Sequence, residues 1–317
     1  MKEFEGSAIG KMLRYLNDPN VISFAGGLPS SDVFPLDIVK NATEKSLKED
    51  WTHVLQYTPI PGERDLMEAV IDYLKEDDIH IEPENIMITT SGQHGLDLVG
   101  RLFLNPQDAI VIDLPTFGGA LAAFELEDAQ YVARDIEEDG TDVNGLRAEI
   151  EEYIDKKGKK PKFIYVVPDF QNPSGITTSL DKRLALLELG KMFKIPIVED
   201  SPYRELRYRG KHLPSIYSLD KNQGHVIGLY TFSKILCPGI RVGFNIGPPE
   251  VVKKFAFIKG ANILNTPNLN QNISRTLLQY YYLDTHLQKT RKYYSEKLNF
   301  FLKALEDNFR VDMGVSR

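Results

Sequence analysis

The residues best suited to do chemistry surround Lys234. Thr231 and Ser233 precede this lysine directly after the apolar run 226–230, and Arg241 follows it seven residues later. A lysine amine can form a Schiff base with an aldehyde and later move protons, which is the chemistry of pyridoxal phosphate (PLP) enzymes. The two hydroxyls and the planar guanidinium are suitable donors to the phosphate of that cofactor. A surface turn is the alternative for this segment alone, so the prediction depends on agreement with other segments.

A second candidate for phosphate binding is the turn at Ser91, Gly92 and Gln93. It follows an expected strand at 86–89 and precedes an expected helix. The first N–H groups of a helix have no partner within the helix, and the helix dipole favours an anion there. We therefore expect the cofactor's phosphate at this turn, with a plain strand-to-helix connection as the alternative.

Four residues on three further segments can contact the ring of the cofactor. Phe117 follows an apolar run and can stack on a pyridine ring, although a core phenylalanine gives the same pattern. Asn172 lies in an Asn-Pro-Ser-Gly turn, and its amide can donate to a phenolate oxygen. Asp200 ends an apolar run, where its carboxylate needs a partner such as a protonated ring nitrogen. An exposed turn-capping role is the alternative for Asp200, and Tyr203 can reach the phenolate side.

Short β-branched runs alternate with helical patterns between residues 86 and 246. Strands are expected at 86–89, 109–112, 130–132, 163–167, 195–198, 226–230 and 242–246. Most of these runs are continuously apolar, which is typical of strands covered on both faces. The alternation predicts an α/β fold whose large domain holds a mostly parallel seven-stranded sheet covered by helices.

The sequence pattern becomes mainly helical after Gly247-Pro248-Pro249. We therefore divide the chain into an N-terminal segment, 1–25, a large cofactor-binding domain, 26–248, and a smaller α/β domain that begins at 249–317 and is incomplete. The N-terminal segment is assigned to the smaller domain and the substrate side.

Composition excludes several classes of function. The chain has 38 Lys and Arg against 45 Asp and Glu, a net charge of −7, which does not favour nucleic acid or an anionic membrane surface as a partner. The N-terminus lacks the apolar core of a signal peptide, and no apolar run is long enough to span a membrane. The single cysteine, Cys237, fits a reducing compartment, so we expect a cytoplasmic protein; we expect a packing role for this residue. No metal site is expected.

The motifs, in this order and spacing, resemble those of fold-type-I PLP-dependent aminotransferases. The nearest likeness is to the 2-aminoadipate/kynurenine aminotransferase-like group of class I/II, and it extends over about residues 20–317. The segments that carry it are Phe24-Ala25-Gly26-Gly27-Leu28-Pro29, Gln56-Tyr57 with Pro61-Gly62, Asn172-Pro173-x-Gly175, Asp200-x-x-Tyr203, and Thr231 to Arg241.

The resemblance implies an enzyme that moves an amino group from an α-amino acid to a 2-oxo acid, with 2-oxoglutarate as the expected acceptor, through a Lys234 aldimine. Lys234 would also carry the proton during transfer, and Asp200 would keep the ring nitrogen protonated. Gly27 and Asn172 would lie near the substrate. Tyr57 would reach the phosphate in a neighbouring subunit, so the resemblance also implies a homodimer with shared active sites.

Two departures from the family pattern leave alternatives open. Phe117 stands where tyrosine is frequent, so stacking is kept and a hydroxyl is lost. The family continues into a C-terminal region that carries the arginine for the substrate α-carboxylate, and this sequence ends at Arg317 before it. A fragment, or a PLP-binding protein that handles substrate poorly, is therefore expected. Another fold-type-I enzyme, such as a β-lyase or synthase, and a non-catalytic ligand-sensing domain remain the alternative functions.

Overall fold

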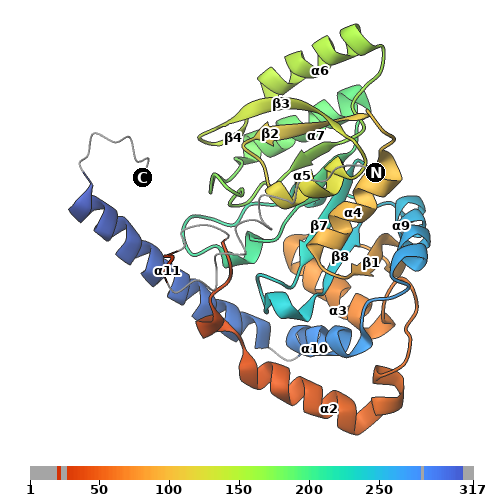
Figure 1. Cartoon of the computed structure of the whole chain (residues 1–317), viewed down its shortest axis with the longest axis vertical. Coiled ribbons are helices and arrows are strands. Elements are labelled where there is room, and N and C mark those ends of the chain that lie inside the picture. Colours follow the sequence, from red (N-terminus) through yellow and green to blue (C-terminus); the bar gives the residue numbers. More distant parts are fainter. Residues whose placement is uncertain (1–19, 23–26, 280–281, 310–317) are drawn as a thin grey trace.

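The computed structural model describes residues 20–22, 27–279 and 282–309. Most of the N-terminal segment 1–25 and the Phe24–Gly26 part of the first motif lie outside the described residues. An eight-stranded sheet occupies the centre, and the long helix α11 (Tyr282–Asn308) extends away from it (Figure 1). No helix in the described ranges combines the length and the apolarity needed to cross a bilayer.

All seven expected strands are present, and the predicted α/β sheet is confirmed. The strands are β1 (Ile86–Thr89), β2 (Ala109–Leu114), β3 (Gln130–Glu137), β4 (Gly140–Thr141), β5 (Ile164–Val166), β6 (Ile197–Asp200), β7 (Val226–Thr231) and β8 (Gly243–Ile246). Their spatial order is β1-β8-β7-β6-β5-β2-β3-β4. The middle of the sheet, from β7 to β3, is parallel, whereas β8 is antiparallel to both of its neighbours. The eighth strand, β4, was not expected; it pairs antiparallel with β3 at the edge.

Helices cover both faces of the sheet, as the continuous apolar strands predict. Alternate residues of each strand point to opposite faces, so Ile110 and Ile112 pack with one set of helices while Val111 packs with the other. The first face carries α4 (Gly92–Phe103), α5 (Gly118–Glu125) and α9 (Pro249–Asn262). The second carries α3 (Arg64–Leu74), α6 (Val143–Lys157), α7 (Leu180–Phe193), α8 (Ile216–Asp220) and α10 (Asn268–Gln279).

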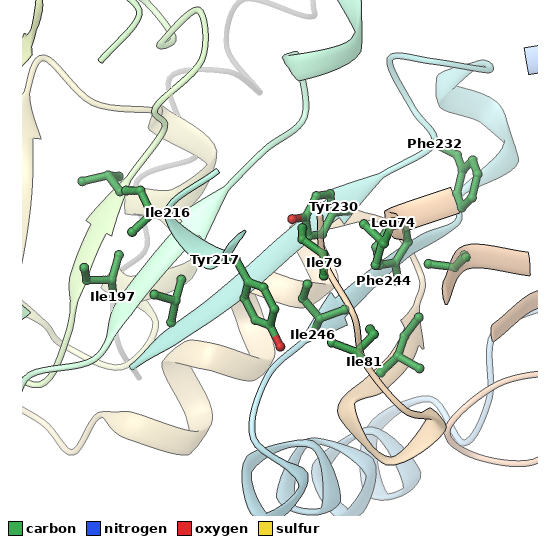
Figure 2. Packing of buried hydrophobic residues seen from close by; sticks show 14 of the residues in the cluster. Leu74, Ile79, Ile81, Ile197, Ile216, Tyr217, Tyr230, Phe232, Phe244 and Ile246 are labelled. Carbon is green, nitrogen blue, oxygen red and sulfur yellow. The ribbon is translucent and has the colours of Figure 1, made fainter. Parts of the chain in front are cut away.

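The larger of the two cores lies on the second face. Figure 2 shows Tyr230 of β7 and Phe244 of β8 among side chains from Leu74, Ile79 and Ile246. The two rings stack with their centroids 4.7 Å apart. Aromatic side chains bury large apolar areas, so this packing stabilises the pairing of β7 with β8, the two strands that the Lys234 loop connects.

The topology brings the candidate residues to one edge of the sheet. The parallel strands β2, β5, β6 and β7 all end there, and β1 points the same way because it is antiparallel to β8, which is antiparallel to β7. The connections after these strands contain the predicted residues Ser91, Phe117, Asn172 and Lys234, and Asp200 is the last residue of β6. Ligands of open α/β sheets bind at this carboxyl edge.

Candidate active site

The predicted phosphate turn lies at the start of α4, next to the end of β7 and the beginning of β8. Ser91 precedes α4 with φ at 82°, and the helix begins at Gly92. A Cβ on Gly243 would lie 3.0 Å from the carbonyl carbon of Ser91, so glycine at that position allows β8 to approach the turn closely. A Cβ on Gly92 would lie 3.6 Å from the Cβ of Thr231. The two predicted phosphate-binding segments therefore meet.

Hydrogen bonds join the polar side chains of these two segments. Arg241 donates from Nη2 to the Ser91 hydroxyl and from Nη1 to the carbonyl of Pro238, 3.2 Å away. The Thr231 hydroxyl donates to the Ser233 hydroxyl at 3.0 Å and accepts from the Ser233 backbone N–H at 3.1 Å. The structure thus gathers a guanidinium, three hydroxyls and a helix N-terminus, which together form an anion-binding arrangement.

Lys234 lies beside the residues predicted to contact the ring. Its Nζ is 5.7 Å from the centroid of the Tyr203 ring. The Tyr203 hydroxyl accepts a hydrogen bond from the Asn172 amide at 3.0 Å. Burial lowers the pKa of Lys234, because the charged ammonium loses its hydration. A lysine with a lowered pKa is more readily available as the neutral amine that a nucleophile requires.

Asp200, at the end of β6, is a buried carboxylate that accepts a hydrogen bond from a tyrosine. The Tyr165 hydroxyl donates to its Oδ2 at 2.9 Å. Burial raises the pKa of Asp200 to about 7, and the bond from Tyr165 opposes that shift. A neighbouring cation would stabilise the ionised form. Sequence reasoning predicted Asp200 and missed Tyr165, whose only signal was a polar group within an apolar strand.

Phe117 and Gln93 meet at the start of α5. A Cβ on Gly119 would lie 2.5 Å from the Phe117 ring and 2.8 Å from the Gln93 amide oxygen. The Gln93 amide donates to the Gly119 carbonyl at 2.7 Å. Both side chains therefore lie beside the phosphate turn. The Phe117 ring is half-buried, so part of it is accessible for stacking on a ligand.

Tyr57 and Gly27 stand apart from this group. Tyr57 is 74% exposed, and Gly27 is exposed with φ at 54°. Among the described residues, neither forms a hydrogen bond with the cluster around Lys234. Exposure of Tyr57 is what a side chain completing the site of another subunit requires, and that role stays a prediction.

The turn after Tyr57 is bound tightly to β1 by a residue that sequence reasoning missed. Lys259 of α9 is buried and donates from Nζ to the carbonyls of Ile60, at 2.5 Å, and Ile88, at 2.7 Å. The Ile88 N–H donates to the Pro61 carbonyl at 2.7 Å. Burial lowers the pKa of Lys259 to about 7. Nothing in the local sequence around Lys259 distinguishes it from a surface lysine of an amphipathic helix.

The donors and acceptors around Lys234 fit PLP. Asp200 provides a carboxylate whose pKa is raised by burial, and a pyridinium N–H is a cationic partner that would stabilise its ionised form. Asn172 and Tyr203 carry donors close to Lys234, and the turn at Ser91–Gln93 with Arg241 can hold a phosphate. The chemistry of this donor set matches the ring nitrogen, the phenolate oxygen, the aldehyde and the phosphate of that cofactor.

Comparison with known proteins shows the family of the chain. The sequence matches the aminotransferase class I and II family over residues 19–316. It is 38% identical over 304 residues to the aromatic-amino-acid aminotransferase 1 of Thermococcus litoralis, covering 96% of this chain and 72% of that protein. It is 36% identical over 315 residues to the 2-aminoadipate transaminase of Thermus thermophilus, covering 99% of this chain and 76% of that protein.

A solved structure shares the fold. The Pyrococcus horikoshii kynurenine aminotransferase, crystallised with PMP and with KYN as substrate and KYA as product, superposes with a TM-score of 0.92 at 37% identity. The match covers 98% of this chain and 76% of that one. The chain belongs to the class I and II aminotransferases. It is a PLP-dependent aminotransferase, as its sequence motifs predicted.

Proposed function

We propose that the chain transfers an amino group from an α-amino acid to 2-oxoglutarate, with Lys234 as the residue that holds the cofactor and carries the proton. The observation that supports this most directly is the position of the Lys234 Nζ next to Tyr203, which is itself bonded to Asn172. When bound, PLP supplies an electron sink for the substrate Cα. The contribution of the protein is to orient the cofactor and to move a proton at one atom, the Lys234 Nζ.

Each remaining residue has one task in this proposal. Asp200 holds a proton on the ring nitrogen, and Tyr165 holds Asp200 in place. Asn172 and Tyr203 donate to the phenolate oxygen, while Phe117 stacks on the ring and excludes water from that face. The phosphate is bound by Ser91, Gly92, Gln93, Thr231, Ser233 and Arg241. Gly27, together with Asn172, lies on the substrate side.

The amino donor in this proposal has a large side chain. Support comes from the names of similar proteins, which are an aromatic-amino-acid, a 2-aminoadipate and a kynurenine aminotransferase. A panel of phenylalanine, kynurenine, 2-aminoadipate, aspartate and alanine tests this, scored by conversion of the bound cofactor to its amine form in a single turnover. Rates for phenylalanine, kynurenine or 2-aminoadipate should exceed those for alanine and aspartate. Conversion by none of the five would contradict the proposed reaction.

A homodimer with shared sites is also part of the proposal. Trp51, Leu55 and Tyr57 are 60%, 65% and 74% exposed, and Tyr57 borders a groove with Pro267 and Leu269. Contiguous exposed apolar side chains mark interaction surfaces. A two-fold axis beside this surface would carry each Tyr57 to the phosphate in the partner. We further propose a cytoplasmic location and a division into a large domain and a smaller one. Because α9 and α10 cover the two faces of the sheet, we place this boundary after α10 and not at residue 248.

Replacement of Tyr57 by phenylalanine should weaken PLP retention without dissociating the dimer. One hydrogen bond to a charged phosphate contributes about 1.5–3 kcal/mol, so the dissociation constant of the cofactor should rise roughly ten- to a hundredfold. Equilibrium dialysis measures the constant, and light scattering measures the mass. Tyr131→Phe, on β3, is the control for loss of a hydroxyl.

Mixing inactive subunits separates a shared site from a local one. Lys234→Ala is combined with a strongly impaired variant of Tyr57, and subunit exchange is followed by mass. In hybrid dimers one of the two sites has both residues intact, so activity should rise to about a quarter of that of the wild type. Activity that stays flat while hybrids form would show that Tyr57 serves its own subunit.

A further inference from the structure

The loop that carries Asn172 is fixed at its base by a buried ion pair outside the cofactor site. Asp169 and Arg183 are 2% and 0% exposed, and the Arg183 Nη2 donates to the Asp169 Oδ1 at 2.8 Å. The same guanidinium donates to the carbonyls of Pro168 at 3.1 Å and Thr178 at 2.9 Å, which lie at the two ends of the loop. Arg183 therefore closes the loop, and Asp169 lies inside it.

A second arginine connects this loop to the segment that carries Tyr203. Arg207 is 12% exposed in its side chain and donates from Nη2 to the same Asp169 oxygen at 2.6 Å. Its guanidinium carbon also lies 4.5 Å from the centroid of the Phe170 ring, a cation–π contact. Arg207 thus holds two consecutive residues of the loop, although it belongs to a different connection.

Short, rigid stretches of chain separate these contacts from the two donors. Tyr203 directly precedes the 3-10 helix η4 (Arg204–Leu206) and Arg207 directly follows it, so the two residues flank one short helix. Asp169 is three residues before Asn172, and between them Gln171 donates to the Pro115 carbonyl at 2.5 Å. Displacement of Arg207 relative to Asp169 would therefore displace Tyr203 relative to Asn172.

We propose that Arg207, acting through Asp169, is a positioning residue that sets the placement of Tyr203 against Asn172. The proposal rests on the function proposed above for that pair, which is donation to the phenolate oxygen of the cofactor. Neither Arg207 nor Asp169 contacts that oxygen in this account. Their role is to keep the two donors at the separation, 3.0 Å, at which both can aim at one acceptor.

The expected signature is spectroscopic. Donors to the phenolate oxygen stabilise its negative charge. They therefore favour loss of the proton that this oxygen shares with the Lys234 nitrogen joined to the cofactor. Weaker donation should therefore raise the pH midpoint of the visible absorption change of bound PLP. For one hydrogen bond to a charged group the expected shift is about one pH unit.

The test compares Arg207→Met with Lys211→Met in the full chain loaded with PLP. Methionine at position 207 keeps apolar contact with Phe170 but cannot bond Asp169. Lys211→Met is the control, because it removes the same positive charge at an exposed residue four positions away in the sequence. Arg204 still anchors the segment, since its Nε donates to Asp77 at 2.8 Å. We expect the midpoint to rise by about one unit in Arg207→Met and to stay within a few tenths of a unit of the wild type in Lys211→Met.

A double variant separates positioning from charge. In a Tyr203→Phe background the donor that Arg207 positions is gone, so Arg207→Met should add less than half of its shift in the wild type. The same shift in both backgrounds would mean a direct charge effect and would overturn the proposal. Asp169→Asn keeps the oxygen that accepts from Arg207 but removes its charge, so it should raise the midpoint by less than Arg207→Met does. No shift in Asp169→Asn would show that Asp169 is not the intermediary, and the proposal would be wrong.

Failure of this inference differs from failure of the proposed function. A protein that gives no visible band with PLP would contradict the cofactor site itself. A normal band that titrates identically in the wild type, Arg207→Met and Asp169→Asn would contradict only the role of Arg207. Thermal unfolding of each apoprotein shows whether a variant is folded, and Asp169→Asn provides the test if Arg207→Met is not.

Discussion

Lys234→Ala is expected to bind PLP weakly and to lose transamination by about 10⁴-fold, the upper range for removal of a general acid–base group. The Lys234 Nζ is the amine beside Tyr203 and Asn172, and burial lowers its pKa. Without it the amine that we propose as carrier of the proton at the substrate Cα is gone. Single-turnover conversion of the bound cofactor by a good amino donor measures the loss.

Covalent labelling identifies the lysine independently of activity. Borohydride treatment of the yellow protein should attach the cofactor permanently to Lys234, as peptide mapping by mass spectrometry would show. Lys259 is the natural control, because its pKa is also lowered, to about 7, yet its Nζ bonds the carbonyls of Ile60 and Ile88. A label on Lys259 or any other lysine would refute the assignment.

Asp200→Ala should lower kcat by about 10²–10⁴-fold, because breaking a buried ion pair costs about 3–5 kcal/mol. The carboxylate is buried at the end of β6, and its pKa of about 7 leaves it ready to ionise once a ring N–H faces it. The loss falls mainly on kcat, since charge that develops in the transition state needs the protonated ring more than bound substrate does. Steady-state kinetics at saturating PLP separates kcat from KM.

Two control variants test whether the loss of kcat is specific to the carboxylate of Asp200. Asp200→Glu keeps the carboxylate and should cost less activity than Asp200→Ala. Asp113→Asn changes another buried carboxyl of the sheet, whose pKa burial raises to about 6 and which accepts from Thr141 at 3.0 Å. Its kcat should change less than about tenfold, the range of a neutral hydrogen bond. Wild-type kcat in Asp200→Ala would remove Asp200 from the mechanism.

The central strands and the gathering of the candidate site residues at one edge of the sheet were predictable from sequence for one physical reason. A strand covered on both faces is continuously apolar, so a polar residue at its end, such as Asp200, or shortly after it, such as Ser91, stands out. Parallel strands then bring those positions to one edge of the sheet. β4 has no such signal, because its two residues, Gly140 and Thr141, pair with β3 only once the intervening turn has formed.

Contacts between residues far apart in the sequence could not be predicted from the sequence. Tyr165 bonds Asp200 because β5 and β6 are in a register that sets Tyr165 opposite Val198, and a shift of one residue would turn its side chain to the other face. The bond from Arg207 to Asp169 likewise joins two connections whose relative position only the folded sheet defines. Local sequence contains no record of such distances.

The attachment of the Tyr57 turn to β1 has a consequence for communication between subunits. β1 is four residues long; Pro61 and Lys259 bind it on one side, and it continues directly into the phosphate turn at Ser91. If Tyr57 serves the partner's cofactor, this short strand directly connects the phosphate turn of its own subunit to the turn that presents Tyr57 to the other active site. Loading of the first site would then alter the affinity of the second, and by thermodynamic linkage the reverse would hold to the same degree. The two sites of the dimer would titrate with cofactor as a cooperative pair.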